Sequence, residues 1–457
     1  MKTIKSLFII SASALFLSLA ACQKFVEIDG PKNQVTTELV FSDSTKANAA
    51  LVGIYYQMAA AGNFGFCSGG LPLYTGLSSD ELAYTATDAT IAAFYSNNVL
   101  SGSDRNTQLY SLGYKYIYAA NACIEGIGAS TNIEAGTKNK MVAEAKFLRA
   151  FCYFNLTNLY GAVPLVTSTD YNSTRLLPRS PTNDVYEQIV DDLRFAQENL
   201  PSDQVSKDRA NYFAACSLLA RVYLYTGRYA EAATAADKVI SSGKFILESN
   251  LNNVFLAASG ETIWHILSVN PLQATYDALN FVPTTATAKP RYALTAALYG
   301  SFESGDARKT SWAKVNTNAG TQYPYPYKYK IRSTTGTPGE HYVVLRLAEL
   351  YLIRSEAKAN SGNINGGRDD LNVVRKRAGL PNSSVTDKAG LLTAIENERR
   401  VELFSEWAHR WFDLKRTGRA APILTPQKPG FTANSLLYPI PVRELNSNPN
   451  MSQNPGY

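Results

Sequence analysis

The clearest periodic pattern in the chain runs from residue 142 to residue 160. Apolar residues recur there every three or four positions, at Val142, Ala145, Leu148, Cys152, Leu156 and Leu159. This spacing predicts a helix with one buried face. Gly161 and Pro164 follow it and favour its end. The same periodicity predicts further helices at about 40–60, 109–127, 184–243 and 343–418.

Residues 210–243 predict a pair of helices joined by a short turn. Large and small residues alternate as in a tetratricopeptide repeat, at Leu219, Ala220, Tyr223, Gly227, Ala232 and Val239. A single pair of this kind cannot bury its own apolar face, so such pairs stack on one another. The sequence therefore predicts a mainly α fold built on tetratricopeptide-like helix pairs.

The helical period is lost at 62–108 and at 244–342, where glycine, proline, threonine and aromatic residues are frequent. The segments "ETIWHIL" and "YPYPYKYKI" predict short strands or a hairpin. Trp264 alternates with Ile263 and Ile266 in the first of them, which predicts a core position. The tail 420–457 also has no helical period. We expect irregular loops and a few short β-hairpins in these regions, which are places where binding sites often lie.

The N-terminus has the features of a signal peptide. Lys2 and Lys5 precede an apolar run that is too short to be an ordinary transmembrane helix. "LAAC", ending at Cys22, resembles the lipobox of bacterial lipoproteins, which implies cleavage before Cys22 and acylation of its thiol. Ordinary secretory cleavage nearby is the alternative. We expect a signal peptide at 1–21, a tether at 22–35 and a folded domain at 36–457.

Composition narrows the class of protein further. The net charge of +6 is mild, and it does not suggest nucleic-acid binding. The 28 tyrosines exceed the 19 phenylalanines, which suits a recognition surface because a tyrosine ring is apolar and its tip forms hydrogen bonds. Beyond Cys22 the cysteines are Cys67, Cys123, Cys152 and Cys216. They form no CxxC pair, so we expect no zinc site and no cofactor. The sequence leaves their disulfide pairing open.

Five segments together resemble the SusD/RagB family of nutrient-binding outer-membrane lipoproteins of the Bacteroidetes. They are the lipobox, "MVAEAKFLRAFCYFNLTNLYGAVPLV", "VLRLAELYLIRSEAKA", "RRVELFSEWAHRWFDLKRTGR" and "LLYPIPVRELNSNPNMSQNPGY". The resemblance implies a SusD-like fold held on the exterior of the outer membrane by lipid on Cys22. It also implies capture of an oligosaccharide or polysaccharide, and delivery to a SusC-like TonB-dependent transporter that the protein covers as a lid. Some members take peptides instead, and the sequence does not separate the two.

Sugar recognition needs flat apolar rings beside planar polar groups, and two regions offer both. From 62–108 the candidate ligand-binding residues are Asn63, Phe64, Phe66, Tyr74, Asp80, Glu81 and Tyr84. From 244–342 they are Asn270, Tyr276, Tyr292, Trp312 and Tyr323. The competing interpretation is that many of these rings pack within the loops or against the helices.

Two other classes of function remain as alternatives, a surface glycoside hydrolase and a structural lipoprotein that holds another protein. Glu398 and Glu402 share one helical face and superficially suggest a catalytic pair. Two carboxyl groups on one helix cannot flank a glycosidic bond, which requires a separation of roughly 5 Å or more across the sugar. We expect them to be buried and paired with Arg399, Arg400 or Arg410. The histidines form no HExxH motif, and we expect no catalytic residue.

Overall fold

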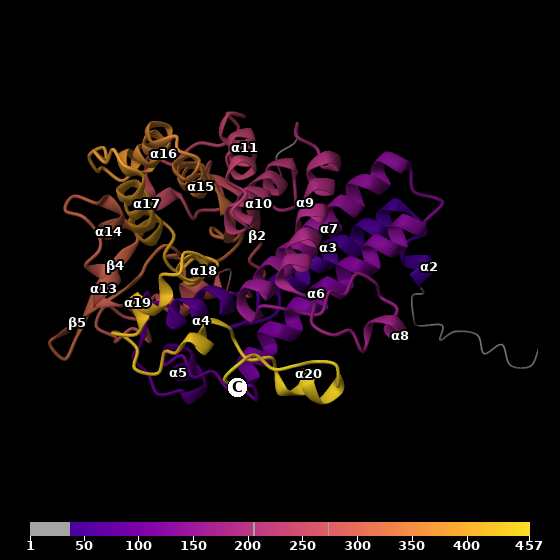
Figure 1. Cartoon of the computed structure of the whole chain (residues 1–457), viewed down its shortest axis with the longest axis horizontal. Helices are drawn as coiled ribbons and strands as arrows, with labels where there is room; N and C mark the ends of the chain where they lie inside the picture. The colour runs from indigo at the N-terminus through magenta and orange to yellow at the C-terminus, as the bar shows by residue number, and fades with distance from the viewer. Residues whose placement is uncertain (1–36, 204–205, 273) are drawn as a thin grey trace, which may run out of the picture.

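The computed structural model describes residues 37–203, 206–272 and 274–457. The predicted signal peptide and the whole predicted tether, including Cys22, lie outside the described residues. The fold is mainly helical, as predicted, with short strands between the helices (Figure 1). Within the described ranges, no helix is both long enough and apolar enough to cross a bilayer.

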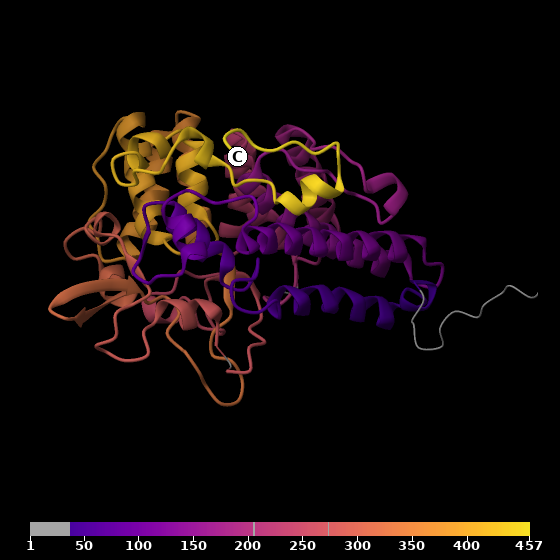
Figure 2. The ribbon, with the colours of Figure 1, turned by 90° about the horizontal axis from the view of Figure 1, so that it is seen from below.

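Long helices from the first half of the chain lie side by side and form one end of the molecule (Figures 1 and 2). They are α3 (Ser44–Ala59), α6 (Asp104–Ala129), α7 (Ala135–Tyr160) and α9 (Thr182–Asn199), with short α2 (Thr37–Val40) and α8 (Tyr171–Thr174). Helix α7 contacts both α6 and α9 and is buried on most sides. It ends at Gly161, whose φ of 74° suits glycine and satisfies the predicted stop.

Helix pairs form the rest of the body. They are α10 (Tyr212–Tyr225), α11 (Tyr229–Ile240), α15 (Leu347–Asn360), α16 (Ile364–Arg377) and α17 (Lys388–Glu402). Helix α10 packs on α11, α11 on α15, and α15 on α16 and α17. Gly227 makes the tight turn between the first two with a φ of 72°. The predicted stacking of tetratricopeptide-like pairs is therefore present.

Three antiparallel two-stranded sheets connect distant parts of the chain. Strand β1 (Leu82–Tyr84) pairs with β3 (Tyr292–Leu294), β2 (Thr262–Ile266) with β6 (Tyr342–Arg346), and β4 (Ala313–Asn318) with β5 (Thr321–Pro326). The remaining short helices are α4 (Gly70–Ser78), α5 (Ala89–Tyr95), α12 (Tyr276–Phe281), α13 (Ala296–Tyr299), α14 (Ala307–Ser311), α18 (His409–Arg416), α19 (Ala420–Leu424), α20 (Val442–Ser447), η1 (Leu251–Asn253) and η2 (Ala433–Leu436).

The helices predicted within 343–418 are wrong at two places. The first residues of this range form strand β6, because β-branched Val343 and Val344 are buried and pair with β2. Helix α17 also stops at Glu402, and the chain runs irregularly to Ala408. Trp407 has a left-handed backbone there, and its Nε1 donates to the Val343 carbonyl at 2.6 Å. Burial of this tryptophan against β6 outweighs the helical period. The aperiodic tail likewise contains short helices, α19 and α20.

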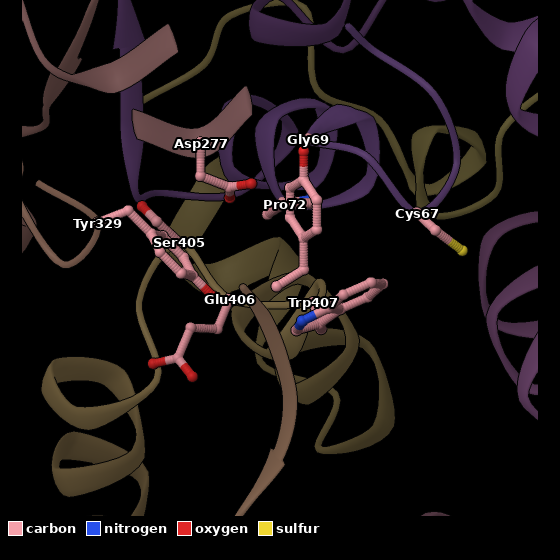
Figure 3. A pocket seen from close by; sticks show the side chains of 9 residues that line it. Cys67, Gly69, Pro72, Asp277, Tyr329, Ser405, Glu406 and Trp407 are labelled. Atoms are coloured by element: carbon pink, nitrogen blue, oxygen red, sulfur yellow. The ribbon is translucent and has the colours of Figure 1, made fainter. Parts of the chain in front are cut away.

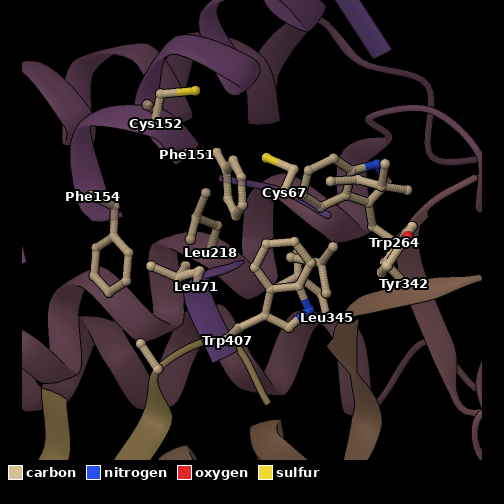
Figure 4. Close-up of a cluster of buried hydrophobic side chains, with 14 of the residues drawn as sticks. Cys67, Leu71, Phe151, Cys152, Phe154, Leu218, Trp264, Tyr342, Leu345 and Trp407 are labelled. Atoms are coloured by element: carbon tan, nitrogen blue, oxygen red, sulfur yellow. The ribbon is translucent and has the colours of Figure 1, made fainter. Parts of the chain in front are cut away.

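The hydrophobic core lies where α4, α7 and the β2–β6 sheet meet (Figure 4). The ring of Phe151 lies edge-on to Trp264 at 5.2 Å and to Trp407 at 5.6 Å. Trp264 is fully buried, as predicted. Cys152 and Cys216 are buried core residues, and the four cysteines of the described ranges are all free thiols. The segment containing α4 was expected to be a loop, but every residue of α4 is buried.

A network of buried charges ties the C-terminal helices to β6. Glu402 accepts hydrogen bonds from Arg308 at 2.8 Å, from Arg346 at 2.6 Å, and from Arg377. Glu398 accepts from Arg308 at 2.6 Å. The two glutamates are therefore buried and paired, as predicted, but their partners differ from those expected.

The three arginines expected to pair with these glutamates have other partners. Arg399 binds Asp413, while Arg400 and Arg410 bind Asp80. The partners of Glu402 approach it from β6, α14 and α16, which only the tertiary fold brings together. Their positions in the chain gave no indication of this.

Candidate functional site

A tight loop before α4 presents Phe64 in a strained backbone conformation. Phe64 has a φ of 70°, which is uncommon for a residue with a side chain. The Ser68 hydroxyl donates to the Gly62 carbonyl at 2.6 Å, and the Gly70 amide donates to the Gly65 carbonyl at 3.0 Å. A Cβ on Gly70 would lie 2.3 Å from the Phe64 carbonyl oxygen, so only glycine fits. Strain of this kind is often found at functional sites.

The β1–β3 sheet brings together the two regions from which the candidate residues were drawn. Tyr84 lies directly opposite Tyr292, and the two rings stack with centroids 5.7 Å apart. Tyr84 is half-buried and Tyr292 is buried. The Asp88 amide donates to the Tyr84 hydroxyl at 2.9 Å. One face of Tyr84 is therefore fixed by the protein while the side chain keeps an accessible part.

A guanidinium group covers the exposed side of the strained loop. Arg105, in the first turn of α6, lies over the Phe64 ring at 4.5 Å from its centroid. It makes no ion pair with a carboxylate of the described residues. Asp88 caps α5, and its pKa is lowered mainly by the Thr90 hydroxyl, with a smaller contribution from Arg105. Arg105 therefore lies near the Asp88 carboxylate but forms no ion pair with it.

Two buried hydroxyl groups lie beneath these residues. Tyr74 stacks between Phe64, at 6.2 Å, and Phe94, at 4.3 Å. The hydroxyls of Tyr74 and Tyr292 have no hydrogen-bond partner among the described residues. Burial raises the pKa of both, that of Tyr292 to about 12, so both stay protonated near neutral pH. Unused buried donors are costly, and a ligand that accepts from them offsets that cost.

We call Phe64, Tyr74, Tyr84, Tyr292, Arg105 and Asp88 the aromatic cluster. Its edge is held by a reciprocal amide pair, in which Asn63 and Asn280 exchange hydrogen bonds of 3.0 and 2.9 Å. This pair fixes the loop to α12. Half-buried Tyr276 lies on the same helix. It lies close to Gly69, because a Cβ atom added to Gly69 would be only 3.0 Å from the Cβ of Tyr276.

Several predicted ligand-binding residues lie in the protein interior instead. Phe66 and Trp312 are fully buried, and the Trp312 indole donates to the Leu251 carbonyl at 2.9 Å. Asn270 is also buried, and its side chain accepts from the Leu272 amide at 2.8 Å. These three residues therefore fit the competing interpretation, in which the side chains pack within the loops or against the helices. Their rings and amide are not at the surface.

The two adjacent carboxylates, Asp80 and Glu81, are also buried. Asp80 receives 2.7 and 3.0 Å hydrogen bonds from Arg410, and Arg400 lies 2.6 Å away. Burial raises the pKa of Glu81 to about 8, and its Oε2 accepts from the Ser405 amide at 3.2 Å. Both side chains therefore join the N-terminal half of the chain to α17, α18 and the segment between them.

Tyr323 lies away from the aromatic cluster, in a cleft of about 770 Å³. Ala83 and Ala293 line this cleft from the β1–β3 sheet. Successive residues of a strand point to opposite faces, so Ala83 and Ala293 face away from the side that carries Tyr84 and Tyr292, and Leu294 at the end of β3 also lines the cleft.

A second cavity, deep in the molecule, is too small for a sugar. It holds only about 10 Å³, and Asp277, Tyr329, Ser405 and Glu406 are among the residues around it (Figure 3). Ligand sites usually measure about 300–1,000 Å³, whereas this volume suits a single water. Burial raises the pKa of Asp277 to about 7. This cavity is therefore a feature of core packing and not a candidate ligand site.

Metal binding has no support in the described ranges, where no three histidine, cysteine or carboxylate side chains are grouped for an ion. The sequence analysis missed Arg105, Asp88 and Asn280, although each is part of the cluster or its edge. Asp88 and Arg105 lay within a region already singled out. Only the fold shows that they meet Phe64 and Tyr84.

Comparison with known proteins identifies the family. Residues 276–457 match the model of the SusD family, and residues 26–224 match a model described as starch-binding and associating with the outer membrane. A SusD-like protein P2 from Formosa agariphila is 28% identical, with all of both chains covered.

Solved structures agree on the fold. A SusD superfamily protein from Bacteroides vulgatus superposes with a TM-score of 0.83 at 18% identity, over 91% of this chain and 100% of the other. A structure named as a laminarin binding SusD-like protein superposes with a TM-score of 0.76 at 27% identity, over 91% and 100%. On the two family matches, which together span most of the sequence, the chain belongs to the SusD/RagB family.

Proposed function

We propose that this protein binds an oligosaccharide at the aromatic cluster, on the cell surface, and passes it to a SusC-like TonB-dependent transporter without cleaving it. The observation that carries the proposal is the meeting of half-buried rings and an unpaired guanidinium group in one place. Tyr84 and Phe64 supply the rings, and the Arg105 guanidinium has donors that no described residue uses.

The chemistry of the cluster matches that of a sugar. The C–H face of a pyranose packs on an aromatic ring, and its hydroxyls accept from and donate to planar polar groups. Tyr84 and Phe64 would contact the sugar faces. Arg105 and Asp88 would supply a donor and an acceptor for adjacent hydroxyls.

The names of related proteins support a glycan ligand. One matched family is described as starch-binding, and one structure at 27% identity is named for laminarin binding. We extend to this chain only the class of ligand and not the particular sugar. The lipobox ending at Cys22 and the outer-membrane association of the matched family support anchoring by lipid. Delivery to a transporter, and the role of lid, rest on membership of the family.

The proposal includes no catalytic step. The one pair of glutamates with helical spacing that suggested hydrolysis is buried, and arginines hold both carboxylates. Burial raises the pKa of Glu402, yet Arg377, Arg346 and Arg308 together keep it well below its usual value. Such a group cannot serve as a general acid near neutral pH.

A binding assay that also analyses the sugar tests the ligand and the absence of chemistry together. The soluble chain from residue 23 would be titrated with laminarihexaose and maltohexaose, and the recovered sugar would be analysed by chromatography. We expect saturable binding of at least one oligosaccharide and recovery at its original length. Shortened products that form with the protein and not in the sugar incubated alone would overturn the non-catalytic assignment.

Copurification tests the transporter. The lipidated protein would be pulled down from outer membranes of its native organism in mild detergent, and its partners would be identified. We expect a large TonB-dependent barrel. A Cys22→Ser variant should no longer be recovered in the membrane fraction and should no longer copurify with the barrel. Recovery of no barrel with the lipidated protein would reduce the proposal to surface binding alone.

A further inference from the structure

The cleft on the far face of the β1–β3 sheet has the size and lining of a second binding site. Its volume of about 770 Å³ lies within the usual range for small-molecule sites. Three half-buried tyrosines line it, Tyr95 from α5, Tyr299 from α13 and Tyr323 from β5. Gln322 and Gln427 add exposed amide groups. Rings and amides are again the groups that recognise sugars.

Each of these tyrosines carries a lysine over its ring. The ammonium of Lys309 lies 4.6 Å from the Tyr299 centroid, that of Lys289 lies 5.2 Å from Tyr323, and that of Lys428 lies 4.9 Å from Tyr95. Lys428 is buried and donates to the carbonyls of Leu77 and Tyr95. The other two are different, because the side-chain ammonium groups of Lys309, which lines the cleft, and of Lys289, which lies over Tyr323 but not in the lining, make no hydrogen bond or ion pair with any described residue.

Carboxylates do not neutralise this charge. Asp80 is the one acidic residue that lines the cleft, and it is fully buried and bound by Arg400 and Arg410. Arg354 and Lys358, by contrast, are both paired with the Asp370 carboxylate. The cleft therefore presents uncompensated positive charge beside aromatic rings.

We propose that this cleft binds an acidic sugar, a uronate or a sulfate ester, with Tyr299 and Tyr323 against the ring and Lys309 on the anionic group, while Lys289, over the ring of Tyr323, adds positive charge beside the cleft. A neutral sugar hydroxyl forms only an ordinary hydrogen bond with an ammonium group, whereas a carboxylate or sulfate forms a stronger, charge-assisted one. The small β1–β3 sheet separates this site from the aromatic cluster. The protein would thus bind one polymer at two sites, and the site in this cleft would select a charged sugar.

Titration of purified protein with acidic oligosaccharides tests the site. The ligands are tetramers of galacturonate, of mannuronate and of sulfated galactose, with maltotetraose as the neutral reference. The variants are Lys309→Gln and Lys289→Gln, alone and together. The matched control is Lys244→Gln, because Lys244 is also an exposed lysine near an aromatic ring, 6.0 Å from Phe213. Circular dichroism would confirm that all variants fold.

We expect at least one acidic tetramer to bind, each single variant to weaken it about fivefold, and the double variant to weaken it about 20-fold. Raising NaCl from about 50 to about 500 mM should weaken wild type more than the double variant. Lys244→Gln and Tyr118→Ala, a change at an exposed tyrosine of α6, should leave this binding unchanged.

The opposite pattern overturns the inference. If none of the acidic tetramers binds, or if they bind the double variant as tightly as wild type, the cleft is not an acidic-sugar site. Binding of neutral oligosaccharides that depends on Tyr84 would in that case leave the proposed function intact. The two ideas therefore fail separately.

Discussion

Tyr84 and Tyr292 are 208 positions apart in the chain and directly opposite each other in the β1–β3 sheet, with their rings stacked at 5.7 Å. The pairing joins two loop-rich regions into one surface. It also places Ala83 and Ala293 on the opposite face, where small side chains leave room for the cleft. One three-residue ladder thus positions both candidate sites.

Removing Tyr84, the half-buried ring of the stacked pair, should weaken glycan binding. For Tyr84→Ala we expect an affinity loss of about tenfold for a neutral hexaose, because a ring contact contributes about 0.5–1.5 kcal/mol beyond area burial. Titration calorimetry measures it. Tyr118→Ala, a change at a tyrosine 58% exposed on α6, is the control and should bind as wild type. An equal loss of affinity in both variants would count against the aromatic cluster as the binding site.

Arg105 offers a second test, because it has no ion pair to lose. Arg105→Ala should reduce affinity for the same hexaose by about fivefold, since it removes donors and the group that covers Phe64. The free energy of unfolding in urea should change by less than about 0.5 kcal/mol. Arg105→Lys should recover part of the affinity but not the planar geometry of the guanidinium. A large loss of stability would show that Arg105 is structural instead.

Neutralising the centre of the buried charge network should destabilise the fold strongly. Glu402→Gln leaves Arg308, Arg346 and Arg377 without their shared carboxylate, and breaking such a group costs about 3–5 kcal/mol. The matched control is Glu396→Gln on the same helix, whose ion pairs are long at 3.4 and 3.3 Å. It should cost less than about 1 kcal/mol. Urea unfolding measures both, and similar costs would contradict the network's role.

Asp277 should make stability depend on pH. Burial raises its pKa to about 7 from an ordinary 3.8, so between these values the folded state holds a proton that the unfolded state has lost. The stabilisation is complete below pH 3.8 and is lost as pH rises through 7. Asp277→Asn mimics the protonated form at every pH. Its stability relative to wild type should therefore rise by up to about 1 kcal/mol per pH unit from pH 4 to 7 and then level off. A difference that stays flat over this range would refute the assignment.

The sequence predicted the helical body well, because the helices and their ends depend on local signals. The period of α7 and the glycine after it are local, and both are seen in the structure. The sequence-based prediction failed where contacts between residues far apart in the chain determine the secondary structure. Val343 and Val344 continue an apolar helical pattern, but pairing with β2 makes them a strand. Trp407 leaves the helix to reach β6, a contact across 64 residues.

The candidate residues show the same division. Composition and loop character indicated the correct two regions, yet aromatic content alone does not separate a surface ring from a core ring. Tyr74 belongs to a helix that is apolar on all sides and therefore buried, whereas Tyr84, ten residues later, is on a short strand with an accessible face. Lys309 had no sequence signal, because its importance lies in the absence of a nearby carboxylate.

The most direct test of the central claim compares binding by wild type and by a Tyr84→Ala/Arg105→Ala double variant, with the sugar analysed afterwards. Laminarihexaose and maltohexaose would be titrated into each protein, with Tyr118→Ala as the control. The account predicts that wild type and the control bind equally, that the double variant is about 50-fold weaker, and that the sugar keeps its length. Equal affinity in the double variant, or a shortened sugar, would contradict it.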